Sequence, residues 1–437
     1  MREAEKWLLG VFLAGMCVAL FGGQAAAQDK PYKYGLIERV RNTYYNNIID
    51  FNDSRDDKTD FMRIRTSVWG QMQLNPQVLA YAKVTNEFRP YLIDPSDRDF
   101  TFHEIFVDNA YVKITGGEDT KVTATIGRQN LIYGEGFIIL DASPLEGSRS
   151  IYFDAAKISI KSGPTTVDLL GMSALQKDKL NPINDQNQAL VNVWEQAYGV
   201  YATNTSLIED HKVEAYVLHK REDTRPELKL NTIGGRVSRK MKDNFAFAAE
   251  LAFQIGTKGG NDQTSFGGYA HGSYLVQEEN KGTVKAGAYY LSGDDPGTSK
   301  LEGWNPIFGR WPKWSELYIY SHITEFAPTN RAPMVAYWTN TFSPFVQYST
   351  NLPMGDLPTK ISFSATAYHL RANQARRLSS GSMSGKVRGN EIQGLFKFVF
   401  NKHVTGHLLV DHFWPGNFYA SPRSGGTFIR TELMLKI

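Results

Sequence analysis

Apolar and polar side chains tend to alternate along the stretch FMRIRTSVWGQMQLN, residues 61–75. Ile64 and Val68 belong to one face of this pattern, and Arg63 and Arg65 belong to the other. A period of two predicts a β-strand whose two faces have different surroundings. In a water-soluble sandwich the apolar face would be buried and the arginines solvated. In a membrane barrel the apolar face would contact lipid, and the arginines would line the lumen.

The same alternation recurs along the chain, without a change of composition that would mark a domain boundary. Clear examples are residues 78–89, 245–255, 361–368 and 391–400. We count about eighteen such segments, which is an even number, as bacterial barrels require. Helical spacing of apolar residues is nearly absent. The sequence therefore predicts an all-β, antiparallel fold.

The connections between these segments alternate between short and long. Short turns are expected at residues 75–76, 116–118, 162–164, 242–243, 278–281 and 401–402. Longer polar links are expected at residues 46–58, 90–101, 130–150, 177–191, 291–333, 372–386 and 415–426, with briefer ones at 221–226 and 257–262. This pattern is typical of a transmembrane barrel of the outer-membrane type, with periplasmic turns and exterior loops. Residues 427–437 alternate as well, so the last strand can pair with the first and close the barrel.

Residues 1–27 are expected to be a cleaved signal peptide. Arg2 and Lys6 precede an apolar core at residues 7–21, and three alanines follow at residues 25–27. The alternative is a transmembrane anchor, which the short apolar core disfavours. Residues 28–437 would then form a single barrel in the bacterial outer membrane. Cys17 is the only cysteine in the chain, so no disulfide is expected in the mature protein.

Composition narrows the class of protein further. A formal net charge of +3 argues against a nucleic-acid-binding protein. A mean hydropathy of −0.36 argues against a helical membrane protein but not against a barrel, whose strands are only half apolar. The 22 Tyr, 25 Phe and 8 Trp suit the aromatic girdles of such barrels. The expected partners of the barrel are outer-membrane lipid, lipopolysaccharide and the barrel-assembly machinery.

The run GRQNLIYGEGFIILDASPLEGSRSIYFDAAKI, residues 127–158, resembles the core motif of the alginate export family of outer-membrane proteins. The matching positions are Gly127, Arg128, Gln129, Tyr133, Gly134, Arg149, Phe153 and Asp154. The resemblance implies an outer-membrane barrel with an electropositive lumen. In the best-known members this lumen carries an anionic polysaccharide out of the cell.

On the barrel interpretation Arg63 and Arg65 face the lumen, because a guanidinium on the lipid face near the midplane costs ~2–4 kcal/mol. The full set of candidate lumen or substrate residues is Arg63, Arg65, Lys83, Glu87, Arg89, Arg128, Arg149, Asp154, Lys157, Arg236 and Arg310. Fixed guanidinium groups offer forked donors to carboxylates and lower the barrier for anions. In the alternative interpretation the role of these basic residues is structural. Their charges then only balance those of carboxylates across the lumen and hold the wall rigid. Arg128, Arg149 and Asp154 suit a network at the rim.

The link at residues 291–333 is the longest, and its aromatic side chains disfavour disorder. It either folds over or into the pore, with Arg310 and Lys313 at its tip, or forms a cap on the surface. No catalytic fingerprint, metal site or cofactor motif is present, so an enzyme is not expected. The sequence favours passive passage of acidic saccharides or small carboxylates. The alternatives are a general or nutrient-specific porin with little charge selectivity, and a non-channel role, as an adhesin or a barrel enzyme, which requires a lumen closed by loops.

Overall fold

The computed structural model describes residues 31–54, 56–94, 100–140, 152–176, 178, 180, 182–184, 193–309, 313–321, 338–353, 359–378 and 380–437. The expected signal peptide, residues 1–27, lies outside this part of the chain. Regular structure in the described residues is almost entirely β-strand, with the short helix α2 (Glu316–Ser321) in addition. No helix in these residues is long and apolar enough to cross a membrane.

The strands follow one another with the short and long connections that the sequence indicates. The first half contains β1 (Tyr32–Asn46), β2 (Thr59–Asn75), β3 (Val78–Ile93), β4 (Phe100–Gly116), β5 (Thr120–Gln129), β6 (Phe153–Ser162), β7 (Thr165–Ala174), β8 (Ile183–Asn184) and β9 (Glu195–Asn204). The second half contains β10 (His211–Glu222), β11 (Leu228–Lys242), β12 (Phe245–Lys258), β13 (Asn261–Gln277), β14 (Gly282–Leu291), β15 (Thr341–Leu352), β16 (Lys360–Arg371), β17 (Val387–Val399), β18 (Val404–Pro415) and β19 (Gly426–Lys436). The link expected at residues 90–101 is shorter than predicted, because pairing between β3 and β4 continues to Pro90 and Phe100.

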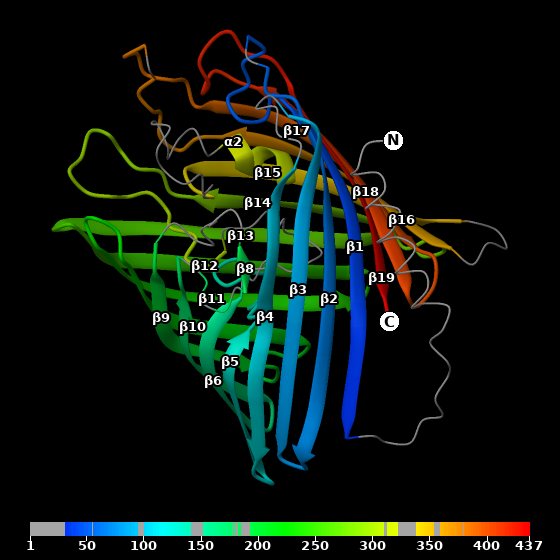
Figure 1. Cartoon of the computed structure of the whole chain (residues 1–437). Helices are drawn as coiled ribbons and strands as arrows, with labels where there is room; N and C mark the ends of the chain where they lie inside the picture. Colours follow the sequence, from blue (N-terminus) through cyan, green and yellow to red (C-terminus); the bar gives the residue numbers. More distant parts are fainter. Residues whose placement is uncertain are drawn as a thin grey trace.

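The strands close into a barrel. Neighbouring wall strands pair antiparallel, and β1 pairs with β19 in a register that sets Val40 opposite Leu433 (Figure 1). β8 is not part of the wall, because it pairs only with β4 at Glu104 and Ile105 while β7 pairs directly with β9. Of the nineteen strands in the described residues, eighteen therefore form the wall. The predicted antiparallel barrel is confirmed.

The two faces of the wall differ as the alternation predicts. Outward positions carry exposed apolar side chains, such as Val217 on β10 and its register partner Ile233 on β11. Inward positions on the same strands carry buried polar groups, such as Glu214 and Thr232. The alternation suits a wall between lipid and a polar lumen, because the outward side chains are mainly apolar and the buried charged groups lie inside.

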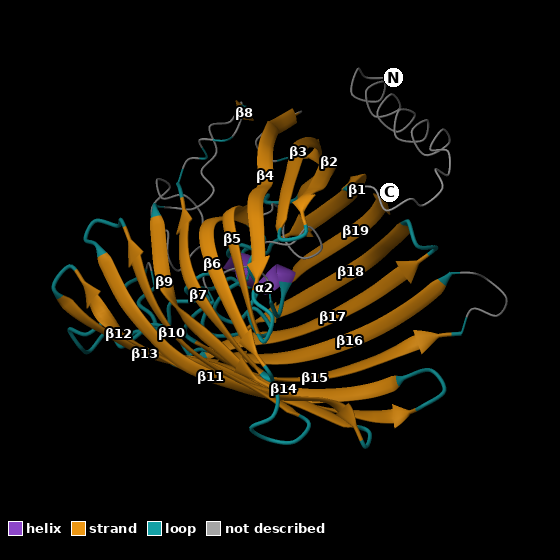
Figure 2. Ribbon diagram, turned by 90° about the horizontal axis from the view of Figure 1, so that it is seen from below, coloured by secondary structure: helices purple, strands orange, loops and turns teal. Residues whose placement is uncertain are grey.

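The inside of the barrel contains parts of two loops, the connections β5–β6 and β14–β15. Their almost fully buried apolar side chains include Phe137, Ile138, Ile139, Trp304, Ile307, Phe308 and Leu317. Figure 2 shows α2, which belongs to the second of these loops, within the ring of strands. Gly267 on β13 faces Trp304 so closely that a Cβ at this position would lie 2.8 Å from the indole.

A charge placed on the outward face tests the assignment of that face to lipid. Ile233 is 54% exposed at the middle of β11. We expect Ile233→Arg to lower the free energy of unfolding in lipid vesicles by about 2–4 kcal/mol, because a guanidinium would lie in hydrocarbon. Urea titration, followed by the heat-modifiable band on a gel, measures the change. Ile233→Leu is the control, and equal stability of the two variants would place this face in water.

Candidate functional site

A segment of the β14–β15 connection lies against the inner wall on the β10–β13 side. Lys220 Nζ on β10 donates to the Ile307 carbonyl at 2.7 Å. Gln254 Nε2 on β12 donates to the carbonyl of Asn305, also at 2.7 Å. These donors are buried wall side chains that bind the backbone of the segment. Hydrogen bonds with the wall therefore fix the path of the loop.

The same connection reaches the opposite wall a few residues later. Ser315 Oγ donates to the carboxylate of Glu391 on β17 at 2.5 Å, and Tyr368 on β16 donates to the Trp314 carbonyl at 2.9 Å. Glu316 of α2 forms an ion pair with Arg430 on β19. The connection therefore crosses the interior from β10–β12 to β16–β19, although its residues 310–312 lie outside the described chain.

The β5–β6 connection packs on this crossing segment. The ring of Phe137 stacks on Trp304 with 5.1 Å between centroids, and Phe308 N donates to the Ile138 carbonyl at 2.9 Å. Together the described residues 131–140, 301–309 and 313–318 narrow the lumen, and we call them the inner constriction.

On the β1–β3 side the wall carries an arginine cluster. The register of β1 and β2 sets Arg39 opposite Arg65, and Arg41 opposite Arg63. Like charges that face each other across strands repel, so the cluster depends on nearby carboxylates. Glu87 on β3 is in contact with Arg65 and lies 3.3 Å from Arg63 Nε and 3.7 Å from Arg39 Nη2.

Glu432 on β19 completes the arginine cluster. Its carboxylate lies 2.6 Å from Arg41 Nη2 and 3.8 Å from Arg39 Nε. The side chains of all four arginines are no more than 3% exposed. The cluster joins strands from the two ends of the chain, so it holds the seam of the barrel.

A second charged group lies on the β10–β13 side, around Glu135 of the inner constriction. The Glu135 carboxylate is 3.1 Å from Arg236 Nη2 on β11, 3.1 Å from His271 Nε2 on β13 and 3.7 Å from Lys313 Nζ. We call these four residues the Glu135 cluster. Burial by itself raises the pKa of the Glu135 carboxyl, but the hydrogen bond with His271 and the charge of Lys313 outweigh burial and lower it. The carboxyl group is therefore ionised at neutral pH.

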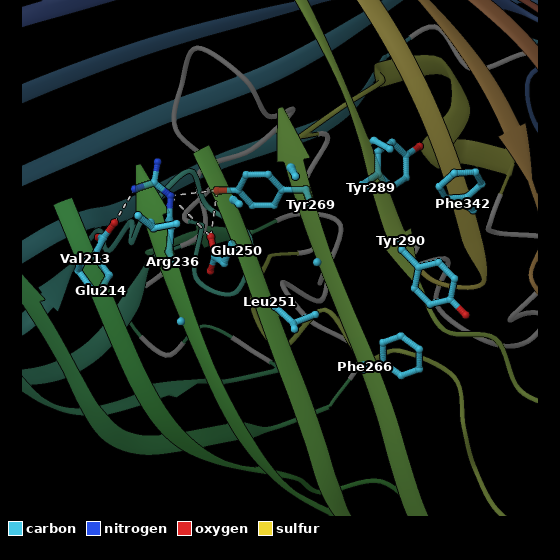
Figure 3. Close-up of a pocket in the computed structure, with 16 residues that line it drawn as sticks. Val213, Glu214, Arg236, Glu250, Leu251, Phe266, Tyr269, Tyr289, Tyr290 and Phe342 are labelled. Carbon is cyan, nitrogen blue, oxygen red and sulfur yellow. Dashed lines mark hydrogen bonds and ion pairs between the residues drawn. The ribbon is translucent and has the colours of Figure 1, made fainter. Parts of the chain in front are cut away.

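Arg236 is held by wall carboxylates independently of Glu135. Its Nη1 lies 2.5 Å from Glu214, and its Nε donates to the Tyr269 hydroxyl at 3.0 Å and lies 3.9 Å from Glu250. Figure 3 shows Arg236 between Glu214 and Glu250, with Tyr269 directed toward them. A hollow of about 650 Å³ at the same strands is lined by residues of both faces of the wall, among them Glu250, Leu251 and Phe266.

Comparison with known proteins identifies the family. The family model described as alginate export matches residues 33–425. The chain belongs to the alginate export family. No curated protein matches it by sequence. As a member of this family, with a barrel that resembles those of porins, the chain is an outer-membrane channel.

Solved structures share the fold of this alginate export family member at low sequence identity. The outer membrane protein OpdK from Pseudomonas aeruginosa matches with a TM-score of 0.55 and 12% identity over 93% of this chain and 98% of its own. OccAB4 from Acinetobacter baumannii matches with a TM-score of 0.55 and 11% identity over the same shares of the two chains. OccK2 (OpdF) from P. aeruginosa, solved in complex with glucuronate, matches with a TM-score of 0.54 and 10% identity over 93% and 98%.

The motif that resembles the alginate export family forms a network at the ends of β5 and β6. Arg128 Nε donates to Asp154 at 2.9 Å, and Arg128 Nη2 donates to Asp178 at 3.0 Å. The guanidinium also lies 4.0 Å from the centre of the Tyr152 ring. The structure thus brings together Arg128 and Asp154, as a rim network requires. Arg149 and Arg310 lie outside the described residues.

The remaining candidates are distributed along the wall. Lys83 Nζ lies 2.9 Å from Asp108, and the Arg89 guanidinium lies 4.6 Å from the centre of the Phe61 ring. Lys157 lies on β6, partly exposed, and is not part of the arginine cluster or the Glu135 cluster. The described candidates therefore divide between the arginine cluster, the Glu135 cluster, the network at Arg128 and other wall positions.

Sequence reasoning missed Arg39, Arg41 and Glu135. The two arginines share the alternation of GLIERVRNTYY with apolar Val40 between them, so the same period of two that indicated Arg63 and Arg65 could have found them. Glu135 lies in an irregular loop between two glycines, where no periodicity exists. Among the described residues, no group of three or more His, Cys, Asp or Glu side chains could hold a metal ion.

Removing the indole of Trp304 tests whether the inner constriction limits flow. The ring is 3% exposed and fills the space between Phe137 and Gly267. We expect Trp304→Ala to raise single-channel conductance in a planar bilayer, because the crossing segment loses its packing. Trp194→Ala is the matched control, since Trp194 is 43% exposed. Conductance that is equal in wild type and Trp304→Ala would contradict a limiting role.

Proposed function

We propose that this outer-membrane channel passes anionic solutes, above all acidic saccharides, by passive diffusion through an arginine-lined lumen and without catalysis. The observation that carries the proposal is the arginine cluster, in which the guanidinium groups of Arg39, Arg41, Arg63 and Arg65 converge on the inner face of adjacent strands. Such a concentration of fixed positive charge favours anions electrostatically and repels cations.

The chemistry of the cluster suits a carboxylate on a sugar. A guanidinium presents two parallel N–H donors that match the two oxygens of a carboxylate. The glucuronate found with OccK2 is an acidic saccharide, and this protein shares the fold of the channel at 10% identity. Both facts support a uronate as the solute class.

A general or nutrient-specific porin with little charge preference is the second candidate. It is favoured by the contacts of Glu87 with Arg65 and Arg63 and of Glu432 with Arg41. If these pairs only hold the wall together, the cluster attracts solutes weakly, because each carboxylate cancels part of the field. The two candidates differ in one measurable quantity, the ratio of anion to cation permeability.

Replacing Arg63 and Arg65 together by Gln tests the proposal. The zero-current potential under a KCl gradient, measured in a planar bilayer, gives the permeability ratio. We expect wild type to prefer anions and the double variant to lose most of this preference, because two lumen charges disappear while the side chains keep much of their size. Arg239→Gln is the control, since Arg239 pairs with Asp243 beside the β11–β12 turn, away from the arginine cluster.

Other outcomes of this measurement distinguish the alternatives. A wild-type permeability ratio near one identifies a general porin and contradicts the proposal. A wild type that does not conduct indicates a barrel closed by its loops. Heat-modifiable migration on a gel establishes that each variant is folded before its current is measured.

A further inference from the structure

The Glu135 cluster has the composition of a carboxylate-binding site whose ligand is already supplied by the chain. One carboxylate is contacted by an arginine from β11, a histidine from β13 and a lysine from the inner constriction. Lys285 on β14 adds a further positive charge that acts on the same carboxyl group. Basic groups from four separate elements that converge on one anion are the usual arrangement by which proteins hold a carboxylate ligand.

Two of the basic groups, Arg236 and Lys313, have anchors other than the Glu135 carboxylate. Arg236 is fixed by Glu214 at 2.5 Å, by Tyr269 at 3.0 Å and by the Ser238 hydroxyl at 2.9 Å. Lys313 Nζ donates to the backbone carbonyl of Glu135 at 2.6 Å, and lies 4.9 Å from the centre of the Tyr269 ring. The positive site is therefore preorganised, because most of its anchors come from the wall or from backbone atoms.

The occupant, by contrast, belongs to a loop and remains partly accessible. Its side chain is 31% exposed, whereas those of Arg236 and Lys313 are 8% and 10% exposed. Gly134 and Gly136 flank it with φ angles of 56° and 78°, in the left-handed region that favours glycine. Gly134 also packs against Arg236, where a Cβ would lie 2.9 Å from Cδ. The backbone thus brings Glu135 to the cations through a turn that larger residues do not readily form.

We propose that Arg236, His271 and Lys313 form a solute-binding subsite for the carboxylate of a uronate sugar, and that Glu135 occupies it as a tethered competitor. A passing uronate displaces the Glu135 carboxylate, binds briefly and is released when Glu135 returns. Weak and reversible binding of this kind is what conduction requires, since a solute held too tightly blocks the pore. This inference rests on the proposed function, because it names a resting point on the same anion path.

Glu135→Gln tests the subsite with the purified, full-length protein in a planar bilayer. The amide keeps the size of the side chain and removes its charge, so the competitor is lost. We expect the concentration of D-glucuronate that half-blocks the current to fall about tenfold, which corresponds to about 1.4 kcal/mol of binding free energy. D-glucose, which has no carboxylate, should affect wild type and variant equally.

Two further variants make the result specific. Glu278→Gln removes a carboxylate from the exposed β13–β14 turn and should leave the glucuronate block unchanged. Glu135→Asp keeps the negative charge on a side chain that is one methylene shorter. We expect this variant to bind glucuronate with an affinity between those of wild type and Glu135→Gln. If heat-modifiable migration shows that Glu135→Gln does not fold, Glu135→Asp is compared with wild type in its place.

The outcomes distinguish a failure of this inference from a failure of the proposed function. An anion-selective wild type whose glucuronate block is the same in Glu135→Gln overturns the subsite and leaves the proposed function intact. A variant in which glucose and glucuronate permeate faster by the same factor shows only a loosened loop, and overturns the subsite as well. A wild type without anion preference overturns the proposed function itself.

Discussion

The structure depends on one constraint: inside a lipid bilayer, each backbone N–H and C=O group must find its hydrogen-bond partner within the protein. The pairing of β1 with β19 meets this constraint, because it leaves the sheet without an edge. Closure then gives every strand one face toward lipid and one toward the lumen. The positions of the charged side chains follow directly from this division.

The charges inside the barrel are a consequence of the same closure, but their arrangement is specific. The arginine cluster lies at the seam where the first three strands meet β19, and the Glu135 cluster joins β11 and β13 to the inner constriction. The inner constriction contacts both sides, through Glu316 with Arg430 and through Glu135 with Arg236. On the proposed function, a solute would therefore meet basic groups on two walls of the barrel.

Much of the fold could be predicted from the sequence because the strand period is local. Residues 61–75 and residues 427–437 each show their two faces without knowledge of any partner. The two-residue strand β8 could not be predicted, since its pairing with β4 joins residues distant in sequence and needs no periodic pattern. The motif at Arg128 also breaks the strict alternation: Gly127 has a φ of 126°, and Arg128 and Gln129 are both buried as a result.

The candidate site was predictable only where it lies on strands. Alternation placed Arg63, Arg65 and Arg236 on the inner face, but their partners are set by register and loop path. The contact between Arg41 and Glu432 joins residues 391 positions apart, and Glu135 reaches Arg236 from an irregular loop. Such contacts arise from closure and packing, and single-sequence patterns do not encode them.

The most direct test of the account compares the entry of two sugars of nearly equal size into proteoliposomes that contain the purified protein. D-glucuronate carries a carboxylate and D-glucose does not, so the ratio of their initial rates isolates the effect of charge. The account predicts faster entry of glucuronate, with an advantage that shrinks as added salt screens the lumen. Equal rates at low salt, or faster entry of glucose, would contradict an arginine-lined path for anions.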